Sequence, residues 1–441
     1  MTPSLPPRPA GAAYWLRRAR LPLTFLARPE PLAAGADGEG SALVDLKIED
    51  RRIAAIVPTG LQPVDAPEFD LDGGMIWPSP VELHTHLDKG HIWPRAENPD
   101  GTFAAALATV AADRGSHWSA ADVRARMSFS LAAAYAHGTR AIRTHLDSLG
   151  PQAGITWPVF AALREEWASR VTLQGVSLVP IDFFRDGTAA EGLTRLVAAH
   201  RGILGAVTYM TPDLGRLLHE IFALAERHGL DLDFHVDETG DPAACSLRHI
   251  AETALARRFP GRIVCGHCCS LARQEPDDID RTLDRVAAAG IAIVSLPMCN
   301  LYLQDRAARR TPRWRGVTLL HEMAARGIAV AISSDNVRDP FYGYGDLDAV
   351  EVFTMAARIA HLDRPVGAWP RTLTTTPAAI MGLADAAGLA VGGAADLILF
   401  RARFWHELLA RPQSDRVVLR NGAIVDAMPP DYRELDQLFG R

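Results

Sequence analysis

Short apolar runs alternate with longer segments of helical period through the middle of the chain. A strand buried on both faces gives a continuous apolar run, whereas an amphipathic helix repeats apolar residues every three to four positions. Helical segments such as 122–137 and 214–228 end near Gly138 and Gly229, residues that favour helix termination. The strand-like runs are 81–86, 141–147, 171–179, 204–210, 230–236, 262–267, 291–296 and 328–334.

This alternation predicts an α/β fold, namely a (β/α)8 barrel of the TIM type. A doubly wound open sheet is the alternative, and such a sheet places its ligands mainly at one switch point. Nearly every predicted strand here ends in a polar residue of catalytic type. That distribution favours the barrel, because barrel sites gather at the C-terminal ends of the strands.

The two ends of the chain differ from the middle. Short β-like stretches within 42–57 are separated by Gly, Pro and Asp, and the tail repeats this pattern within 395–425, with a hairpin signal at Asn421-Gly422. We therefore expect one small composite β-sandwich domain built from both chain ends. The predicted domains are 1–75 for its N-terminal part, 76–375 for the catalytic barrel and 376–441 for its C-terminal part.

Length and charge limit the function. A chain of 441 residues exceeds the size of a single core, which suits a large domain with a smaller one. A net charge of -6 lacks the basic excess typical of nucleic-acid or membrane-surface partners, so we expect a small-molecule substrate. No apolar run is long enough to cross a bilayer, and the N-terminal segment lacks the apolar core of a signal peptide. Five cysteines suit a reducing compartment, so we expect a cytoplasmic protein, and a homo-oligomer is the common case.

Two histidines, His84 and His86, end the first predicted strand. Side chains alternate with period two along a strand, so both imidazoles point the same way and can converge on one ion. Catalytic zinc and iron sites combine His and carboxylate ligands and leave a position open for water. Later strand ends supply further residues of this kind, namely His235, Glu238, His267 and Asp335. We predict one divalent metal ion per subunit, Zn2+ or Fe2+, bound by His84, His86, His235 and Asp335.

Hydrolysis at such a site needs a proton carrier beside water whose pKa the metal lowers to roughly 7. Glu238 is the predicted carrier, and His267 is predicted to hold the hydroxide or the developing oxyanion. The chain has no lysine after Lys89, so a second metal bridged by a carboxylated lysine cannot form there. A mononuclear site follows unless a carboxylate replaces that lysine. His145 is either a residue that positions a ligand or a purely structural one.

Six motifs resemble, in chain order, those of bacterial cytosine deaminases of the amidohydrolase superfamily. They are His84-Thr-His-Leu-Asp-Lys89, Arg143-Thr-His-Leu-Asp147, His235-Val-Asp-Glu238, Gly266-His267, Pro297-Met-Cys-Asn-Leu-Tyr-Leu-Gln304 and Ser334-Asp-Asn-Val-Arg-Asp-Pro-Phe341. The resemblance implies the same four metal ligands. It also implies that Glu238 protonates the ring nitrogen beside the attacked carbon, and that His267 and Asp335 position and deprotonate water.

The resemblance also implies substrate contacts, with three departures from the cytosine deaminase pattern. Gln304 matches a pocket position, whereas Asn336 replaces an aspartate and Phe341 replaces a tryptophan. Ile181 and Asp182 occupy the stretch where cytosine deaminases carry an amide side chain. Lost hydrogen-bond partners change substrate preference strongly, so we expect a cytosine-like or related small N-heterocycle.

The predicted reaction is hydrolytic deamination, in which metal-bound hydroxide attacks a ring C-NH2 carbon and releases ammonia. One alternative is an amidohydrolase that removes an exocyclic N-alkylamine from a triazine-like ring or opens a cyclic amide. Another is a metal-binding scaffold without catalysis, which Glu238 and His267 disfavour because neither is needed merely to hold a metal. The segment 89–102 is predicted to form a lid over the pocket.

Overall fold

The computed structural model describes residues 13–61, 63, 65–384 and 386–440. The first twelve residues of the predicted 1–75 segment therefore lie outside the described residues. The chain forms two compact units, each built from separate pieces of sequence: 1–81, 134–140 and 349–429 in the first, and 82–133, 141–348 and 430–441 in the second. The predicted domain boundaries stay a prediction.

All eight strands predicted for the barrel are present. They form a three-stranded sheet, β6-β7-β8, and a five-stranded sheet, β9 to β13. Isolated parallel bridges join the sheets at Val176↔Ile203 and at Thr85↔Asp335, so the strands follow the cyclic order of a (β/α)8 barrel. The bounds are β6 Val81–Thr85, β7 Ala141–Asp147, β8 Thr172–Leu178, β9 Leu204–Thr208, β10 Leu232–Val236, β11 Ile263–His267, β12 Ala292–Ser295 and β13 Val330–Ile332.

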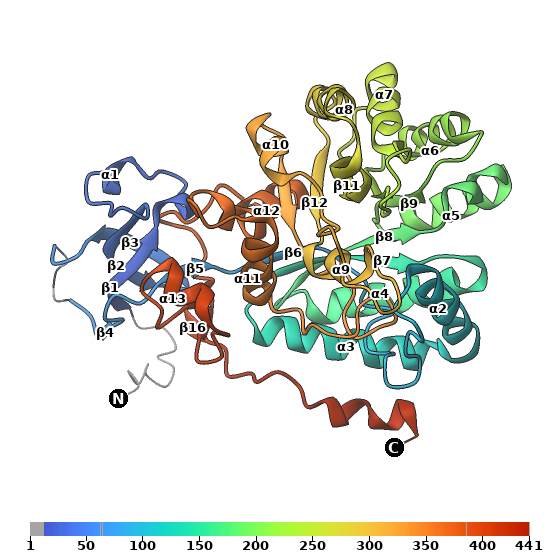
Figure 1. Cartoon of the computed structure of the whole chain (residues 1–441). Helices are drawn as coiled ribbons and strands as arrows, with labels where there is room; N and C mark the ends of the chain where they lie inside the picture. Colours follow the sequence, from blue (N-terminus) through green and yellow to red (C-terminus); the bar gives the residue numbers. More distant parts are fainter. Residues whose placement is uncertain (1–12, 62, 64, 385, 441) are drawn as a thin grey trace. The chain divides into compact units, whose positions relative to one another are not determined.

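Helices alternate with these strands, and Figure 1 shows α5 to α8 outside them. Helix α6 buries Leu217, Leu218 and Ile221 and ends at Gly229, whose φ of 64° forms a left-handed cap as predicted. The described helices are too short or too polar to span a membrane. Their bounds are α2 Phe103–His117, α3 Ala120–Ala136, α4 Ala153–Trp167, α5 Gly187–Ala199, α6 Leu214–His228, α7 Ser246–Arg257, α8 Pro276–Ala288, α9 Pro297–Leu303 and α10 Leu320–Ala325.

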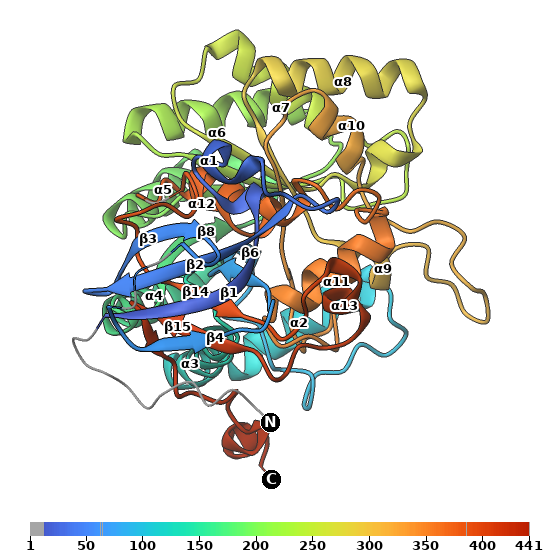
Figure 2. The same cartoon turned by 90° about the vertical axis from the view of Figure 1, so that its left-hand side faces the viewer.

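The first unit contains two four-stranded sheets, ordered β3-β2-β1-β4 and β16-β15-β14-β5. Figure 2 shows β1 to β4 side by side. Strand β5 pairs antiparallel with β14, which joins the two ends of the chain in one sheet and agrees with the predicted composite domain. The bounds are β1 Tyr14–Pro22, β2 Ser41–Glu49, β3 Arg52–Pro58, β4 Glu68–Asp70, β5 Ile76–Pro78, β14 Leu397–Leu399, β15 Val417–Arg420 and β16 Ala423–Ile424.

An aromatic cluster forms much of the core of the first unit. The ring of Trp77, on β5, lies 5.4 Å from that of Phe25 and 5.6 Å from that of Phe400, which follows β14. Phe353 of α11 (Ala349–Ala360) and Trp405 of α13 (Trp405–Ala410) complete the cluster. Tilted and edge-on aromatic pairs of this kind stabilise a core beyond the area that they bury. The pairing of β5 with β14 therefore depends on side chains from both ends of the sequence.

We expect the substitution Leu397→Ala to lower the free energy of unfolding of the first unit by about 3 kcal/mol, because it leaves a cavity in a packed core. Leu397 is fully buried on β14 between β5 and β15. The matched substitution Leu61→Ala, at a side chain that is 73% exposed, should change that free energy by less than about 0.5 kcal/mol. Calorimetric unfolding of both variants tests this, and equal shifts would contradict it.

Candidate metal centre and active site

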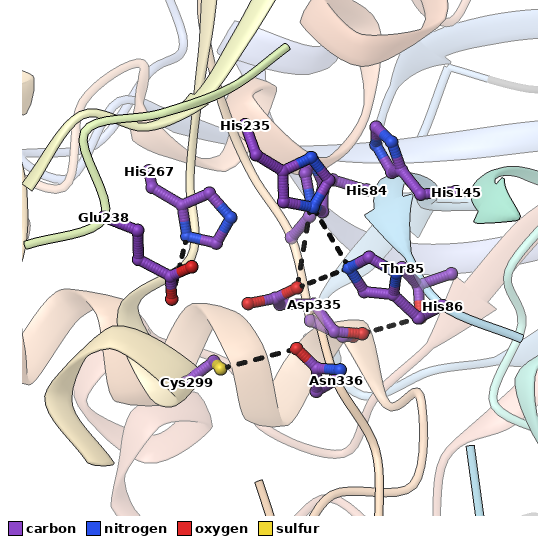
Figure 3. A network of polar contacts seen from close by, with 12 residues as sticks. His84, Thr85, His86, His145, His235, Glu238, His267, Cys299, Asp335 and Asn336 are labelled. Carbon is purple, nitrogen blue, oxygen red and sulfur yellow. Dashed lines mark hydrogen bonds and ion pairs between the residues drawn. The ribbon is translucent and has the colours of Figure 1, made fainter. Parts of the chain in front are cut away.

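Four side chains from distant parts of the second unit converge on one buried point (Figure 3). His84 and His86 come from the end of β6, His235 comes from β10, and Asp335 follows β13. The Nε2 atom of His235 lies 3.2 Å from Nε2 of both His84 and His86. Asp335 Oδ1 lies 3.2 Å from His86 Nε2 and 3.6 Å from His84 Nε2. The structure thus brings together all four residues that the sequence predicts as metal ligands.

Local backbone geometry aims these side chains. Asp335 and His267 have φ values of 66° and 67°, in the left-handed region that non-glycine residues rarely adopt. The Asp335 amide donates to the His84 carbonyl at 2.9 Å, and Thr85 Oγ1 donates to the Asp335 carbonyl at 2.7 Å. These bonds hold the strained turn against β6. A strained, over-determined backbone of this kind is typical of functional sites.

Strand β11 passes close to the ring of His84. A Cβ atom at Gly266 would lie 2.9 Å from His84 Cε1, closer than real Cβ contacts allow. Position 266 therefore has no room for a side chain, and a glycine there lets β11 run past the His84 ring to His267. This explains physically why Gly266 precedes His267 in the sequence.

The charges at this point are unbalanced. Burial lowers the pKa values of His84, His86 and His235 far below the usual value, so these imidazoles are neutral. Burial also raises the pKa of Asp335 to about 8. Among the described residues, no nitrogen or hydroxyl group donates a hydrogen bond to either carboxylate oxygen of Asp335, and the thiol of Cys299 is a weak donor beside it. Burying the charge of a carboxylate is costly, and a cation bound at this point would relieve that cost.

The donor set fits a divalent metal ion. Two ligand atoms that each lie roughly 2.1 Å from a tetrahedral zinc ion are roughly 3.4 Å apart. The distances of 3.2 to 3.6 Å among the donors of His84, His86, His235 and Asp335 match that separation. Three neutral imidazoles with one carboxylate are also the ligand types that zinc and iron prefer.

An acid–base pair lies beside these four donors. One oxygen of Glu238, one nitrogen of His267 and one oxygen of Asp335 all lie within 4.8 Å of one another. Glu238 Oε1 is 3.3 Å from His267 Nδ1. Burial, and then the Asp335 charge, raise the pKa of Glu238 well above its usual value, whereas burial lowers the pKa of His267 to about 3. Glu238 thus favours its protonated form, and His267 is neutral.

Asn300, on α9, joins this pair and was not singled out from the sequence. Its Nδ2 lies 3.1 Å from Glu238 Oε1 and 3.0 Å from His267 Nδ1. Asn300 lies in the same motif as Gln304, so the resemblance to cytosine deaminases could have indicated it as a site residue. Gln304 Nε2 itself donates to the Glu238 carbonyl at 3.2 Å, so both residues act on the segment that carries Glu238.

A second residue that the sequence did not single out is Lys89. Its ammonium is buried, 3.5 Å from Asp147 Oδ1 and 5.3 Å from the ring centre of Phe341. Asp147 also accepts from Arg114 at 2.9 Å, so this carboxylate has two cationic partners. Lys89 is the last residue of the His84 motif. Its burial was not predicted, because a charged side chain after a strand is ordinarily exposed.

The residues predicted to contact substrate differ in burial and in their polar partners. Asn336 is buried, and its Nδ2 donates to Asp339 at 2.6 Å while its Oδ1 accepts from the thiol of Cys299 at 3.7 Å. Phe341 is buried beside Lys89. Ile181 and Asp182 begin the 3-10 helix Ile181–Arg185, where Ile181 is buried and Asp182 is 37% exposed. Contact of any of these residues with substrate stays a prediction.

His145 lies directly behind the four donors. Its ring centre is 4.0 Å from that of His84 and 4.5 Å from that of His235, and its Nε2 is 3.8 Å from Asp233 Oδ1. Asp233 in turn accepts from Arg143 at 2.8 Å. Of the two interpretations left open by the sequence, this packing supports a role in positioning the ligand rings.

The segment 89–102 is tied down at several points. Arg95 pairs with Asp113 at 2.8 Å and with Asp122 at 2.6 Å. Asn98 Nδ2 donates to the Pro340 carbonyl at 2.9 Å. Arg126, fully buried, donates to backbone carbonyls at the start of the segment. The predicted lid role stays a prediction, and opening this segment would require breaking these contacts.

Comparison with known proteins assigns the chain to a protein family. The model of the amidohydrolase family (Amidohydro_3) matches residues 160–426. The chain belongs to this family. A pterin deaminase of Rhizobium rhizogenes is 54% identical over 92% of this chain and 93% of its own. Amidohydrolases of this family act on carbon–nitrogen bonds, so the chain is a hydrolase of that class, as predicted.

Solved structures of other amidohydrolases share the fold. The 5-methylcytosine deaminase of Klebsiella pneumoniae superposes with a TM-score of 0.80 at 24% identity, over 95% of this chain and 98% of its own. The N-isopropylammelide isopropylaminohydrolase of Burkholderia multivorans superposes with a TM-score of 0.73 at 26% identity, over 94% and 98% of the two chains. The predicted fold and the resemblance to deaminases of this superfamily are confirmed.

We expect His235→Ala to lower metal affinity by more than about 100-fold, because even partners that only orient a ligand contribute roughly 10- to 100-fold. Metal content after dialysis, measured by elemental analysis, tests this. The control is His219→Ala, an exposed histidine on α6, which should keep the metal content of the unmodified protein. Full metal content in His235→Ala would remove this residue from the ligand set.

Proposed function

We propose that this amidohydrolase is a pterin deaminase, which hydrolyses the exocyclic amine of a 2-amino-4-oxopteridine and releases ammonia. The observation that carries the proposal is the 54% identity to a pterin deaminase along nearly the whole of both chains. The placement of Glu238 beside the four converging donors supports the chemistry. The predicted class, a deaminase of a small N-heterocycle, thereby narrows to a bicyclic heterocycle.

His84, His86, His235 and Asp335 would hold one divalent ion, Zn2+ or Fe2+, because their donor atoms already converge. When bound, such an ion lowers the pKa of water to roughly 7 and so supplies a nucleophile at neutral pH. His145, packed against the rings of His84 and His235, keeps these two imidazoles in place.

Glu238 moves the protons. Its raised pKa keeps a proton on the carboxyl group, which can donate it to the ring nitrogen beside the attacked carbon. The carboxylate that results can take a proton from the water that adds to the carbon and pass it to the amine as the carbon–nitrogen bond breaks. The overall reaction consumes one water, forms a ring carbonyl and releases one ammonia.

His267 and Asn300 orient the reacting groups. Asn300 contacts both Glu238 Oε1 and His267 Nδ1, so it fixes the carboxyl group and the imidazole relative to each other. A nitrogen of His267 also lies within 4.8 Å of His84 and His235 nitrogens. This places the neutral imidazole where it can hydrogen-bond to the attacking oxygen and to the oxyanion that develops.

Removal of an alkylamine is the second candidate function. It is favoured by the N-isopropylammelide isopropyl amidohydrolase of Pseudomonas sp., which is 22% identical over 81% of this chain. Product analysis separates the two reactions, because isopropylamine rather than ammonia would appear. The higher identity to the pterin deaminase is the reason for preferring deamination.

We expect Glu238→Gln to lower kcat for ammonia release from pterin by roughly 10²- to 10⁴-fold while metal content stays unchanged, because the amide cannot shuttle protons. An enzyme-coupled ammonia assay with pterin and cytosine measures this, and chromatographic detection of isopropylamine measures any turnover of N-isopropylammelide. The matched control is Glu252→Gln, a half-exposed glutamate on α7 paired with Arg285. Normal turnover in Glu238→Gln would refute the role, and absence of ammonia from pterin in the unmodified enzyme would refute the function.

A further inference from the structure

The segment between α9 and α10, residues 305–315, is strongly basic. It contains five arginines and one acidic residue, although the whole chain has a net charge of -6. The arginines are Arg306, Arg309, Arg310, Arg313 and Arg315. None of these arginines belongs to the catalytic groups described above, so a concentration of positive charge at this place needs a separate explanation.

Both ends of this basic segment lie against the catalytic groups. It starts directly after Gln304, whose side chain donates to the Glu238 carbonyl. It returns at Gly316, where a Cβ atom would lie only 2.8 Å from the Asn300 carbonyl oxygen. Just before that return, the Trp314 ring packs on Gly240, two residues after Glu238. The basic segment is therefore anchored at the rim of the active site.

Part of its charge is already neutralised. Asp305 forms an ion pair with Arg310, and the hydrogen bond from that guanidinium holds the pKa of Asp305 at about 2. Arg306 donates to the Tyr302 carbonyl at 2.8 Å. Arg309 and Arg313 are exposed, and no carboxylate in the described part of the chain lies within 4.0 Å of either guanidinium. Two guanidinium groups thus remain for a ligand.

We propose that Arg309 and Arg313 bind an anionic substituent, a carboxylate or a phosphate, on the substrate at the end opposite to the hydrolysed amine. This inference rests on the proposed deamination of a pteridine. The amine-bearing carbon must lie beside Glu238 and the four donors, so the far ring carbons, C6 and C7, face the rim. A guanidinium matches the planar geometry of a carboxylate or phosphate and can donate two parallel hydrogen bonds to it.

Trp314 adds an apolar surface at the same place. Its ring lies beside Gly240, and the guanidinium of Arg273 is 5.4 Å from the ring centre. An aromatic side chain at the rim suits a flat bicyclic ligand, and the neighbouring cation increases the positive potential there. The preferred substrate is accordingly a pteridine with a negative charge on its second ring.

Binding measurements on the full-length Glu238→Gln variant test the inference without turnover. Calorimetry gives the affinities of pterin, of pterin-6-carboxylate and of 6-hydroxymethylpterin phosphate. The affinity ratio is the affinity for either anionic pterin divided by that for pterin. It should fall about tenfold when Arg309→Ala and Arg313→Ala are added to the Glu238→Gln variant. Raising NaCl to about 0.5 M should shrink that ratio in the parent and leave it unchanged in the variant without the two arginines.

The control is Arg195→Ala, an exposed arginine on α5 that pairs with Glu191, which should leave the ratio as in the parent. A ratio that is unaffected by the loss of Arg309 and Arg313 overturns the inference. Preference for the carboxylate over the phosphate, or the reverse, identifies the anion. Ammonia release from pterin by the unmodified enzyme is measured in parallel, so failure of the proposed function is distinguished from failure of the anion site.

Discussion

One buried carboxylate, Asp335, dominates the organisation of the second unit. It lies among three imidazoles that burial keeps neutral, and in the described part of the chain no nitrogen or hydroxyl group donates a hydrogen bond to either of its oxygens. Such an arrangement is unfavourable by itself and becomes favourable with a divalent cation. The requirement that β6, β10 and the end of β13 meet at one point explains the strained turn at Asp335.

The predicted metal ligands and the acid–base residue Glu238 are held in place by different parts of the backbone. The ligand donors come from strand ends, whose hydrogen bonds to neighbouring strands fix them, and His145 packs behind them. Glu238 instead follows the end of β10, where Asp237 accepts from the amides of Ser246 and Leu247 at the start of α7. The acid–base group is thus held by a loop and a helix terminus. Asn300 and Gln304 add hydrogen bonds that hold Glu238 in place.

With the proposed anion site, chemistry and substrate selection would use different parts of this amidohydrolase. The converging donors and Glu238 belong to strands and the turns after them, which the fold constrains. The basic segment 305–315 belongs to a connection that can change without disturbing the strands. The proposed anion site would therefore let the substrate preference change while the hydrolytic groups stay constant.

The sequence alone determined the eight barrel strands and the convergence of His84 with His86, because buried strands and period-two alternation are local patterns. It did not reveal β1, since a bulge between Leu16 and Ala19 interrupts the alternation there. Only the tertiary structure placed Asn300 between Glu238 and His267, and buried Lys89 beside Asp147. Such contacts join residues far apart in the chain, and their energies depend on burial and distance, which no local pattern records.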